Sequence, residues 1–297
     1  KILFCGYHGW HDWYLAANLS PGSLDSHLFP QIDPTGVPQC LAGSAIPFPY
    51  GDTAALEQLL DLHSGEVAAI MMEPLRSEMP PEGYLEQVRR LATKHNVVLI
   101  FDEVSTGFRA SAAGVQTVVG TIPDMAVFAK SISNGYAMGA VVGKRDVMEP
   151  AARMFVSSTY WSDTIGLRAA LTTLREIRRR DVPAKLHQLG RHLKTTLNEV
   201  ASETGCPVSC VGIDTHPRLE FDIDASLTAQ VTTLYIQEMA KQGCHGYTSY
   251  YLNAAQGDTE VEQTANAARK TFSLIVQALN KGNVDQFVEA SQQEDLF

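Results

Sequence analysis

The sequence predicts an α/β protein in which a mostly parallel sheet is covered by helices on both faces and is followed by a smaller α+β domain. Three observations lead to this fold class. Short apolar runs alternate with amphipathic helical stretches through the first two thirds of the chain. The run at residues 97–101 is apolar throughout, as expected for a strand that is buried on both faces. After Gly205 this alternation ends, and short strand-like runs mix with longer helical ones.

The first region contains the elements of the predicted parallel sheet in order. The chain opens in a strand-like run that ends at Gly6. Residues 84–95 are predicted to form a helix, because their apolar side chains recur every three or four positions. Residues 20–50 contain many Pro and Gly and no clear period, which indicates a long loop. The further predicted strands lie at residues 67–72, 97–101, 125–129 and 138–143.

Two helices are predicted to connect the sheet to the C-terminal region, at residues 164–180 and 183–203. Asp163 suits an N-cap, and Pro183 suits a first helical turn. We place a domain boundary near residue 205, which gives a large domain at 1–204 and a small domain at 205–297. The small domain is predicted to contain strands at 207–211 and 218–221 and helices at 225–242 and 261–279.

The composition argues against several classes of protein. The 23 Lys and Arg residues are outnumbered by 33 Asp and Glu residues, so a nucleic-acid or anionic-membrane surface is not expected. The longest basic run, residues 178–180, is predicted to end a helix. No uncharged apolar stretch reaches the roughly 18 residues of a membrane span. The 5 cysteines are sparse and odd in number, which predicts a cytoplasmic protein. Cys206 and Cys210 have no second pair at zinc-ligand spacing, so no metal site is expected.

Two ionisable residues follow neighbouring predicted strands. Asp102 comes directly after the apolar run at 97–101, and Lys130 comes directly after the run at 125–129. Taken singly, Asp102 could be a helix cap or part of a structural ion pair, and Lys130 could be a surface lysine. Together they match the needs of a pyridoxal phosphate enzyme. In such an enzyme a lysine forms a Schiff base, and a carboxylate keeps the pyridine nitrogen protonated.

At these residues the sequence resembles the class III aminotransferases, which are fold type I pyridoxal phosphate enzymes. Within that family it is most similar to the glutamate-1-semialdehyde 2,1-aminomutase branch. The resemblance extends over essentially the whole chain, and the order and spacing of its motifs make it specific. The motifs are Tyr7-His8-Gly9, Asp102-Glu103-Val104 with Thr106-Gly107, and Lys130 in its loop.

The resemblance implies roles for five residues around a pyridoxal phosphate ring. Lys130 matches the Schiff-base lysine, which also moves a proton between substrate carbons. Asp102 matches the partner of the pyridinium nitrogen. Tyr7 matches the aromatic residue on one ring face, with His8 next to it, and Val104 matches the small apolar residue on the other face.

The resemblance assigns four further residues in less detail. Ser105 matches a position near the ring hydroxyl. Glu73 and Glu78 match positions near the cofactor and substrate, with Glu73 also consistent with a structural carboxylate. Thr159 matches a residue that reaches the cofactor phosphate of a neighbouring subunit, which implies a homodimer with shared active sites. The usual Gly-Asn-Pro after this position is replaced here by residues 162–164, Ser-Asp-Thr.

The implied activity is a pyridoxal phosphate-dependent aminotransferase or aminomutase that acts on an amino acid, an amine or a semialdehyde. A racemase or epimerase on the same scaffold and a non-catalytic fragment or pseudoenzyme remain alternatives. The family also has a segment before Tyr7 that contains a phosphate-binding helix start. We therefore expect the N-terminal part to be missing and the chain by itself to bind the cofactor poorly.

Overall fold

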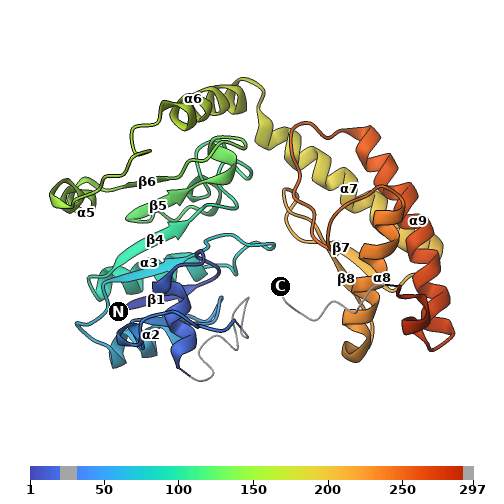
Figure 1. Ribbon diagram of the computed structural model, residues 1–297, viewed down its shortest axis with the longest axis horizontal. Helices are drawn as coiled ribbons and strands as arrows, with labels where there is room; N and C mark the ends of the chain where they lie inside the picture. Colours follow the sequence, from blue (N-terminus) through green and yellow to red (C-terminus); the bar gives the residue numbers. More distant parts are fainter. Residues whose placement is uncertain (21–31, 290–297) are drawn as a thin grey trace. The chain divides into compact units, whose positions relative to one another are not determined.

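The computed structural model describes residues 1–20 and 32–289, which group into two compact units (Figure 1). The first unit comprises residues 1–20, 32–76 and 80–180. The second comprises residues 77–79 together with the described residues from Asp181 onward. Each unit has a sheet and a core of its own.

The first unit is built around a six-stranded sheet whose order is β2-β1-β3-β4-β5-β6. Its first five strands are parallel, and β6 runs antiparallel to β5 at one edge. This arrangement confirms the predicted α/β class with a mostly parallel sheet. The strands are β1 (Ile2–Cys5), β2 (Ala45–Pro47), β3 (Ala69–Met72), β4 (Val98–Asp102), β5 (Met125–Phe128) and β6 (Ala140–Gly143).

The edge strand β2 corrects the prediction of a long loop at residues 20–50. The Ile2 amide donates to the Ser44 carbonyl at 2.8 Å, and the Phe48 amide donates to the Phe4 carbonyl at 3.0 Å, so this segment pairs with β1. Three strand residues are too few to give a periodic pattern, which is why the sequence did not reveal them. A short 3₁₀ turn, η2 (Gln39–Leu41), precedes the strand. The part of the predicted loop at residues 21–31 lies outside the described residues.

Helices pack on both faces of the sheet. On one face, α1 (Asp12–Leu15) and the 3₁₀ turn η1 (Ala16–Leu19) cover Phe4. On the other face, α2 (Thr53–Leu62) and α3 (Tyr84–Lys94) share a core with alternate residues of the central strands. That core includes Leu3, Cys5, Ile70, Met72, Leu99 and Phe101. The alternation places the odd and even residues of each strand in different cores, as the pleat of a strand requires.

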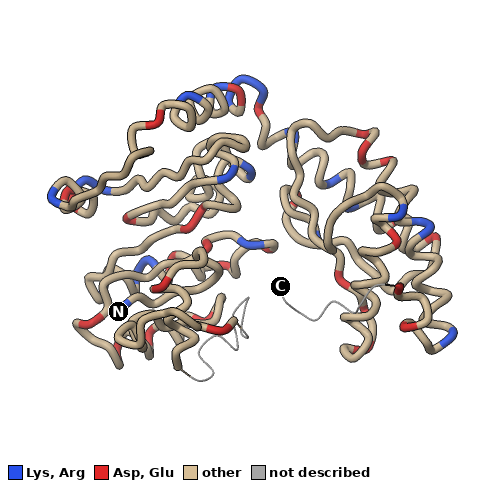
Figure 2. The backbone as a smooth tube through the Cα atoms, viewed as in Figure 1, with Lys and Arg blue, Asp and Glu red and all other residues tan. Residues whose placement is uncertain are grey.

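The remaining helical elements of the first unit follow the C-terminal ends of β4, β5 and β6. Helix α6 matches the prediction, since Asp163 accepts a hydrogen bond from the Ile165 amide at 3.0 Å as its N-cap. Its basic C-terminal end contains Arg178 and Arg179, visible as a blue segment in Figure 2. The elements are α4 (Gln116–Val119), η3 (Lys130–Ile132), α5 (Arg145–Met148), η4 (Glu149–Arg153) and α6 (Thr164–Arg179).

The second unit packs three helices around a two-stranded antiparallel sheet. The Leu219 amide donates to the Thr248 carbonyl, and the Tyr250 amide donates to the Pro217 carbonyl, both at 2.8 Å, so residues 248–250 extend the sheet. Its elements are α7 (Val182–Thr204), β7 (Val208–Val211), β8 (Arg218–Phe221), η5 (Ala225–Leu227), α8 (Thr228–Lys241), α9 (Asp258–Asn280) and η6 (Val284–Phe287).

The boundary between the units lies between Arg180 and Asp181 and not near residue 205. Helix α7, which was predicted to belong to the large domain, contributes Leu193 and Leu197 to the same core as Phe272 of α9. Its apolar stripe therefore belongs to the second unit. Pro183 lies in the first turn of α7, as predicted. Among the described residues, no helix is long and apolar enough to cross a membrane.

Candidate active site

The two predicted catalytic residues lie at the ends of adjacent parallel strands. Asp102 is the last residue of β4, and Lys130 opens the turn η3 two residues after the end of β5. Asp102 pairs with Val127 of β5, so the two strands end at the same edge of the sheet. Open α/β sheets bind ligands at this carboxyl edge.

The Asp102 carboxylate is buried and held from two sides. Only 8% of its side chain is exposed. Its Oδ1 accepts a hydrogen bond from the Val104 amide at 3.0 Å, and its Oδ2 lies 2.8 Å from His8 Nδ1. His8 itself is buried, and its Nε2 lies 3.2 Å from the Cys5 carbonyl oxygen. A buried carboxylate with such partners is fixed in orientation, because losing them would leave it unsatisfied.

Lys130 presents its amine beside a hydroxyl. Its Nζ donates a hydrogen bond to Ser105 Oγ at 2.9 Å. The Lys130 residue is exposed at the sheet edge, and its backbone φ is +46°, a left-handed conformation that is unfavourable for a side chain other than glycine. The Ile132 amide bonds to the Ala129 carbonyl at 3.1 Å, which closes the turn that holds this conformation. The turn therefore fixes the backbone from which the Lys130 side chain extends.

The rings of Tyr7, Trp10 and Tyr14 contact one another and form a cluster that we call the aromatic wall. The Tyr7 and Trp10 ring centroids lie 4.9 Å apart, and Tyr7 meets Tyr14 edge to face at 5.8 Å. Burial, followed by the charge of Asp102, raises the pKa of Tyr7, so its phenol stays neutral. Trp10 is 51% exposed, which leaves apolar ring surface open beside the site.

Glu73 supports the segment that contains Tyr7. Its Oε2 accepts a hydrogen bond from the Tyr7 amide at 3.1 Å. Gly6 has φ +108°, and a Cβ at Gly6 would lie 2.5 Å from the same Glu73 oxygen. Burial raises the pKa of Glu73, opposed by the Tyr7 amide and by the nearby Arg76. Glu73 therefore holds the backbone of the segment that contains Tyr7.

The structure brings most of the predicted site residues together but not all of them. Thr159 lies in an exposed segment between η4 and α6. Glu78 groups with the second unit, where it forms an ion pair with Arg218. The residues gathered at the sheet edge are Tyr7, His8, Glu73, Asp102, Val104, Ser105 and Lys130.

Sequence reasoning gave no separate role to Glu103, which is fully buried next to Asp102. Its Oε2 accepts from the Val115 amide at 2.6 Å, and its own amide donates to the Val127 carbonyl at 2.9 Å. Burial raises the pKa of Glu103 to about 7, and the charge of Asp102 adds to the effect. The sequence contained a signal for Glu103, because a second carboxylate directly follows Asp102 at the end of an apolar run.

This set of side chains fits a pyridine ring that carries an aldehyde. The buried Asp102 carboxylate suits a protonated ring nitrogen, the Lys130 amine suits the aldehyde, and the Tyr7 ring suits stacking. The fit rests on the chemistry of the donors and on the burial of Asp102.

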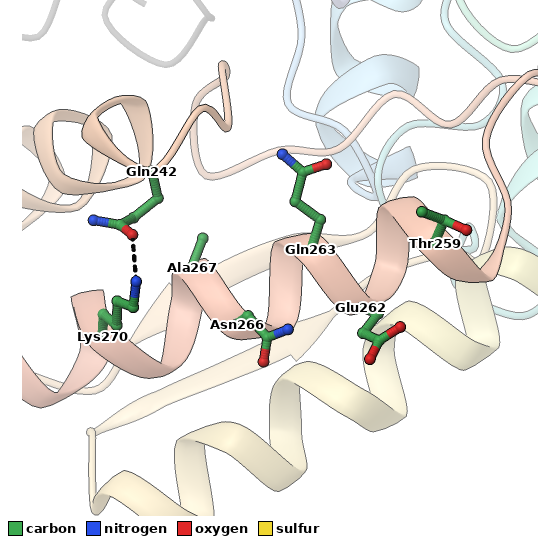
Figure 3. Close-up of a pocket in the computed structure, with 7 residues that line it drawn as sticks. All are labelled: Gln242, Thr259, Glu262, Gln263, Asn266, Ala267 and Lys270. Atoms are coloured by element: carbon green, nitrogen blue, oxygen red, sulfur yellow. Dashed lines mark hydrogen bonds between the residues drawn. The ribbon is translucent and has the colours of Figure 1, made fainter.

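The second unit has a polar groove of about 400 Å³ on the solvent side of α9 (Figure 3). Lys270 donates to Gln242 across it at 2.9 Å. Most of the residues that line the groove are exposed, and none of them belongs to the predicted site. The groove is lined by Gln242, Thr259, Glu262, Gln263, Asn266, Ala267 and Lys270.

Residues 6–212 match the sequence profile of the class III aminotransferases. The chain belongs to this family. The matched range contains the Tyr7 segment, the Asp102 strand end and the Lys130 loop.

Curated relatives agree with this assignment. The chain is 31% identical to 3-aminobutyryl-CoA aminotransferase of Cloacimonas acidaminovorans, over 94% of this chain and 66% of the relative. It is 30% identical to glutamate-1-semialdehyde 2,1-aminomutase of Natranaerobius thermophilus, over 93% of this chain and 68% of the relative. The chain spans about half to two thirds of the length of the curated relatives that it matches.

Solved structures show the same fold. An ω-transaminase from Sphaerobacter thermophilus superposes with a TM-score of 0.79 at 26% identity, over 93% of this chain and 68% of the other. Other structures with this fold were determined with pyridoxal phosphate bound. The α/β class is thereby shared with known aminotransferases.

Proposed function

We propose that this chain forms the catalytic site of a pyridoxal phosphate-dependent aminotransferase or aminomutase that acts on an amino acid, an amine or a semialdehyde. The observation that carries the proposal is the buried Asp102 at the end of β4 beside Lys130 at the end of β5. Membership of the class III family and the aromatic wall around Tyr7 support it.

Each gathered side chain has a part in that chemistry. When bound, pyridoxal phosphate withdraws electrons from the substrate carbon that loses a proton. Asp102 would hold the proton on the ring nitrogen, since its two fixed hydrogen bonds keep its charge in place. Lys130 would bind the aldehyde and then, as a free amine, take a proton from one substrate carbon and return it to another position.

The neighbouring side chains would place the ring and restrict its movement. Tyr7 would pack on one ring face and Val104 on the other. Ser105, which accepts a hydrogen bond from Lys130, would stand near the ring hydroxyl. Glu73 would hold the backbone of the Tyr7 segment in place by accepting a hydrogen bond from the Tyr7 amide.

We also propose that the active unit is a homodimer in which Thr159 reaches the site of the partner. The exposed segment around Thr159 is strongly apolar, with Phe155 95%, Tyr160 81% and Trp161 67% exposed. Large apolar patches on a protein surface usually mark contact sites. A second copy that covers this segment would bury these rings and bring Thr159 close to a neighbouring cofactor phosphate.

The proposed role of Lys130 is tested by the turnover of Lys130→Ala in the full-length protein. Without the Lys130 amine, the protein has no group to bind the cofactor aldehyde or to move the substrate proton. Turnover with a panel of amino donors should therefore fall by several orders of magnitude. Lys94→Ala is the matched control, since Lys94 is an exposed lysine of the same unit that pairs with Glu57. Turnover near the wild-type value in Lys130→Ala, with a normal circular dichroism spectrum, would refute the assignment.

A further inference from the structure

The second unit has a pocket of about 260 Å³ between α8, α9 and the segment that joins these two helices. Its apolar lining includes Met239 of α8 and Leu252 of the joining segment, which are 3% and 4% exposed. An apolar cavity of about 150 Å³ in another protein holds benzene, so this pocket has room for a substituted ring. None of the residues that line it belongs to the candidate active site.

Two tyrosines that line this pocket form a hydrogen bond with each other through their hydroxyl groups, Tyr235 and Tyr250. Tyr235 is 1% exposed. Burial raises the pKa of both phenols, so each hydroxyl keeps its proton near neutral pH. Only one of the two protons can lie between the two oxygens. The other O–H group needs a different acceptor, and the described residues provide no further hydrogen-bond partner for either hydroxyl.

A buried O–H group without an acceptor is costly, because it has left water without gaining a new partner. A ligand in the pocket that offers an oxygen atom would satisfy this group, and an apolar body would cover the walls formed by Met239 and Leu252. An ammonium group does not suit the pair, since it can only donate hydrogen bonds.

The single carboxylate that lines the pocket disfavours an anion. It belongs to Glu260 at the start of α9, and its Oε2 accepts a hydrogen bond from the Gly257 amide at 2.7 Å. A negatively charged ligand would be repelled by it. We propose that this pocket binds a small neutral ring compound that carries a carbonyl oxygen, and that the pair of Tyr235 and Tyr250 donates a hydrogen bond to that oxygen. The site lies wholly within the second unit, so it does not depend on the proposed function.

The binding of acetophenone to the full chain tests this proposal, and α-methylstyrene is a probe of the same shape that lacks the carbonyl oxygen. Methionine methyl groups labelled with ¹³C report the binding by NMR. Met239 lines the pocket, and its signal is assigned by its loss in Met239→Leu; Met125 of β5 is the reference in the other unit. We expect acetophenone to shift the Met239 signal until the site is saturated. An unchanged Met239 signal at millimolar acetophenone would overturn the proposal and leave water as the occupant.

The contribution of the hydroxyl pair is measured in the double variant Tyr235→Phe with Tyr250→Phe, which removes both oxygens and keeps both rings. Acetophenone affinity should fall at least about fivefold, because its carbonyl oxygen loses the donor. The affinity for α-methylstyrene should stay the same or rise, which also shows that the pocket still forms. Equal changes for the two probes, or the loss of both, would contradict the role of the hydroxyl pair.

Discussion

At the scale of single residues, the site depends on carboxylates that are buried at the end of one strand. Asp102 is the last residue of β4, and Glu103 follows it directly. Asp102 has His8 and the Val104 amide as partners. Glu103 has the Val115 amide, and burial raises its pKa to about 7. The two carboxyl groups therefore differ in the hydrogen-bond partners that the protein provides for them.

The raised pKa of Glu103 predicts a specific pH dependence of stability. The folded state binds a proton at Glu103 more tightly than the unfolded chain, whose value is near 4.5. This contribution is fully present below pH 4.5 and is lost as the pH rises to about 7. The expected loss is on the order of 3 kcal/mol of unfolding free energy. Glu103→Gln should abolish this loss. The unfolding free energy of the variant minus that of the wild type should therefore be larger at pH 8 than at pH 5.

Urea unfolding at pH 5, 6, 7 and 8 measures this effect. Glu86→Gln on the exposed side of α3 is the control, because it removes a carboxylate without removing a buried one. A wild-type pH slope that persists unchanged in Glu103→Gln would show that Glu103 is not the titrating group.

Some residues of the site have a local signal in the sequence, and others do not. Asp102 and Lys130 were predicted because each follows an apolar run, and parallel pairing of the strands brings such positions to one edge. The bond of Tyr7 to Glu73 was not predicted, because it joins residues 66 positions apart through a backbone amide. Thr159 lies in an exposed segment, and Glu78 groups with the second unit, so the local sequence pattern did not indicate where either residue lies.

At the scale of elements, the ends of β1 and β3 are locked together by one glycine and one carboxylate. The Glu73 amide continues the pairing by donating to the Cys5 carbonyl at 3.2 Å. The Glu73 side chain then occupies the space where a Cβ of Gly6 would be. Only glycine satisfies both the φ of +108° and this close approach.

Gly6→Ala is therefore expected to destabilise the first unit by roughly 2–4 kcal/mol, through backbone strain and displacement of Glu73. Gly36→Ala is the matched control, since Gly36 has φ +95° and no atom within 4 Å of the position of a Cβ. It carries the backbone strain alone and should cost less by at least about 1 kcal/mol. Thermal melts compare the two. Equal destabilisation would mean that the contact between Gly6 and Glu73 contributes nothing.

The predicted elements were right where apolar periodicity was long and wrong where it was short. Helices α3 and α6 and strand β4 were found because their apolar residues recur over ten or so positions or form an unbroken run. Strand β2 has only three residues and was missed. Helix α7 was found, but its unit was misassigned, since the pattern of a helix shows that it has an apolar side without showing which core receives it.

At the scale of the whole molecule, the first unit exposes a set of large apolar side chains around Thr159. Phe155, Tyr160 and Trp161 lie on this segment, and Ile165 and Leu167 of the following helix α6 are also more than half exposed. These side chains would be costly to leave in water. The proposed dimer gives them a partner and gives Thr159 a function.

The proposed dimer can be tested with a surface variant. Phe155→Ser combined with Trp161→Ser should convert a particle of twice the chain mass into one of a single chain mass, because the loss of two large buried rings removes several kcal/mol of association energy. Light scattering during gel filtration measures the mass. Leu62→Ser is the control, since Leu62 is 74% exposed on α2 of the same unit. A dimer that persists unchanged in the double variant would place the interface elsewhere.

The central claim is that Lys130 is the residue that binds the cofactor, and one measurement tests it most directly. The chain is incubated with an excess of pyridoxal phosphate, reduced with borohydride so that even weakly held cofactor is trapped, digested and mapped by mass spectrometry. The account predicts a reduced pyridoxyl group on the peptide that contains Lys130, and its loss in Lys130→Ala. A label confined to other lysines, or spread evenly over exposed ones such as Lys94, would contradict it.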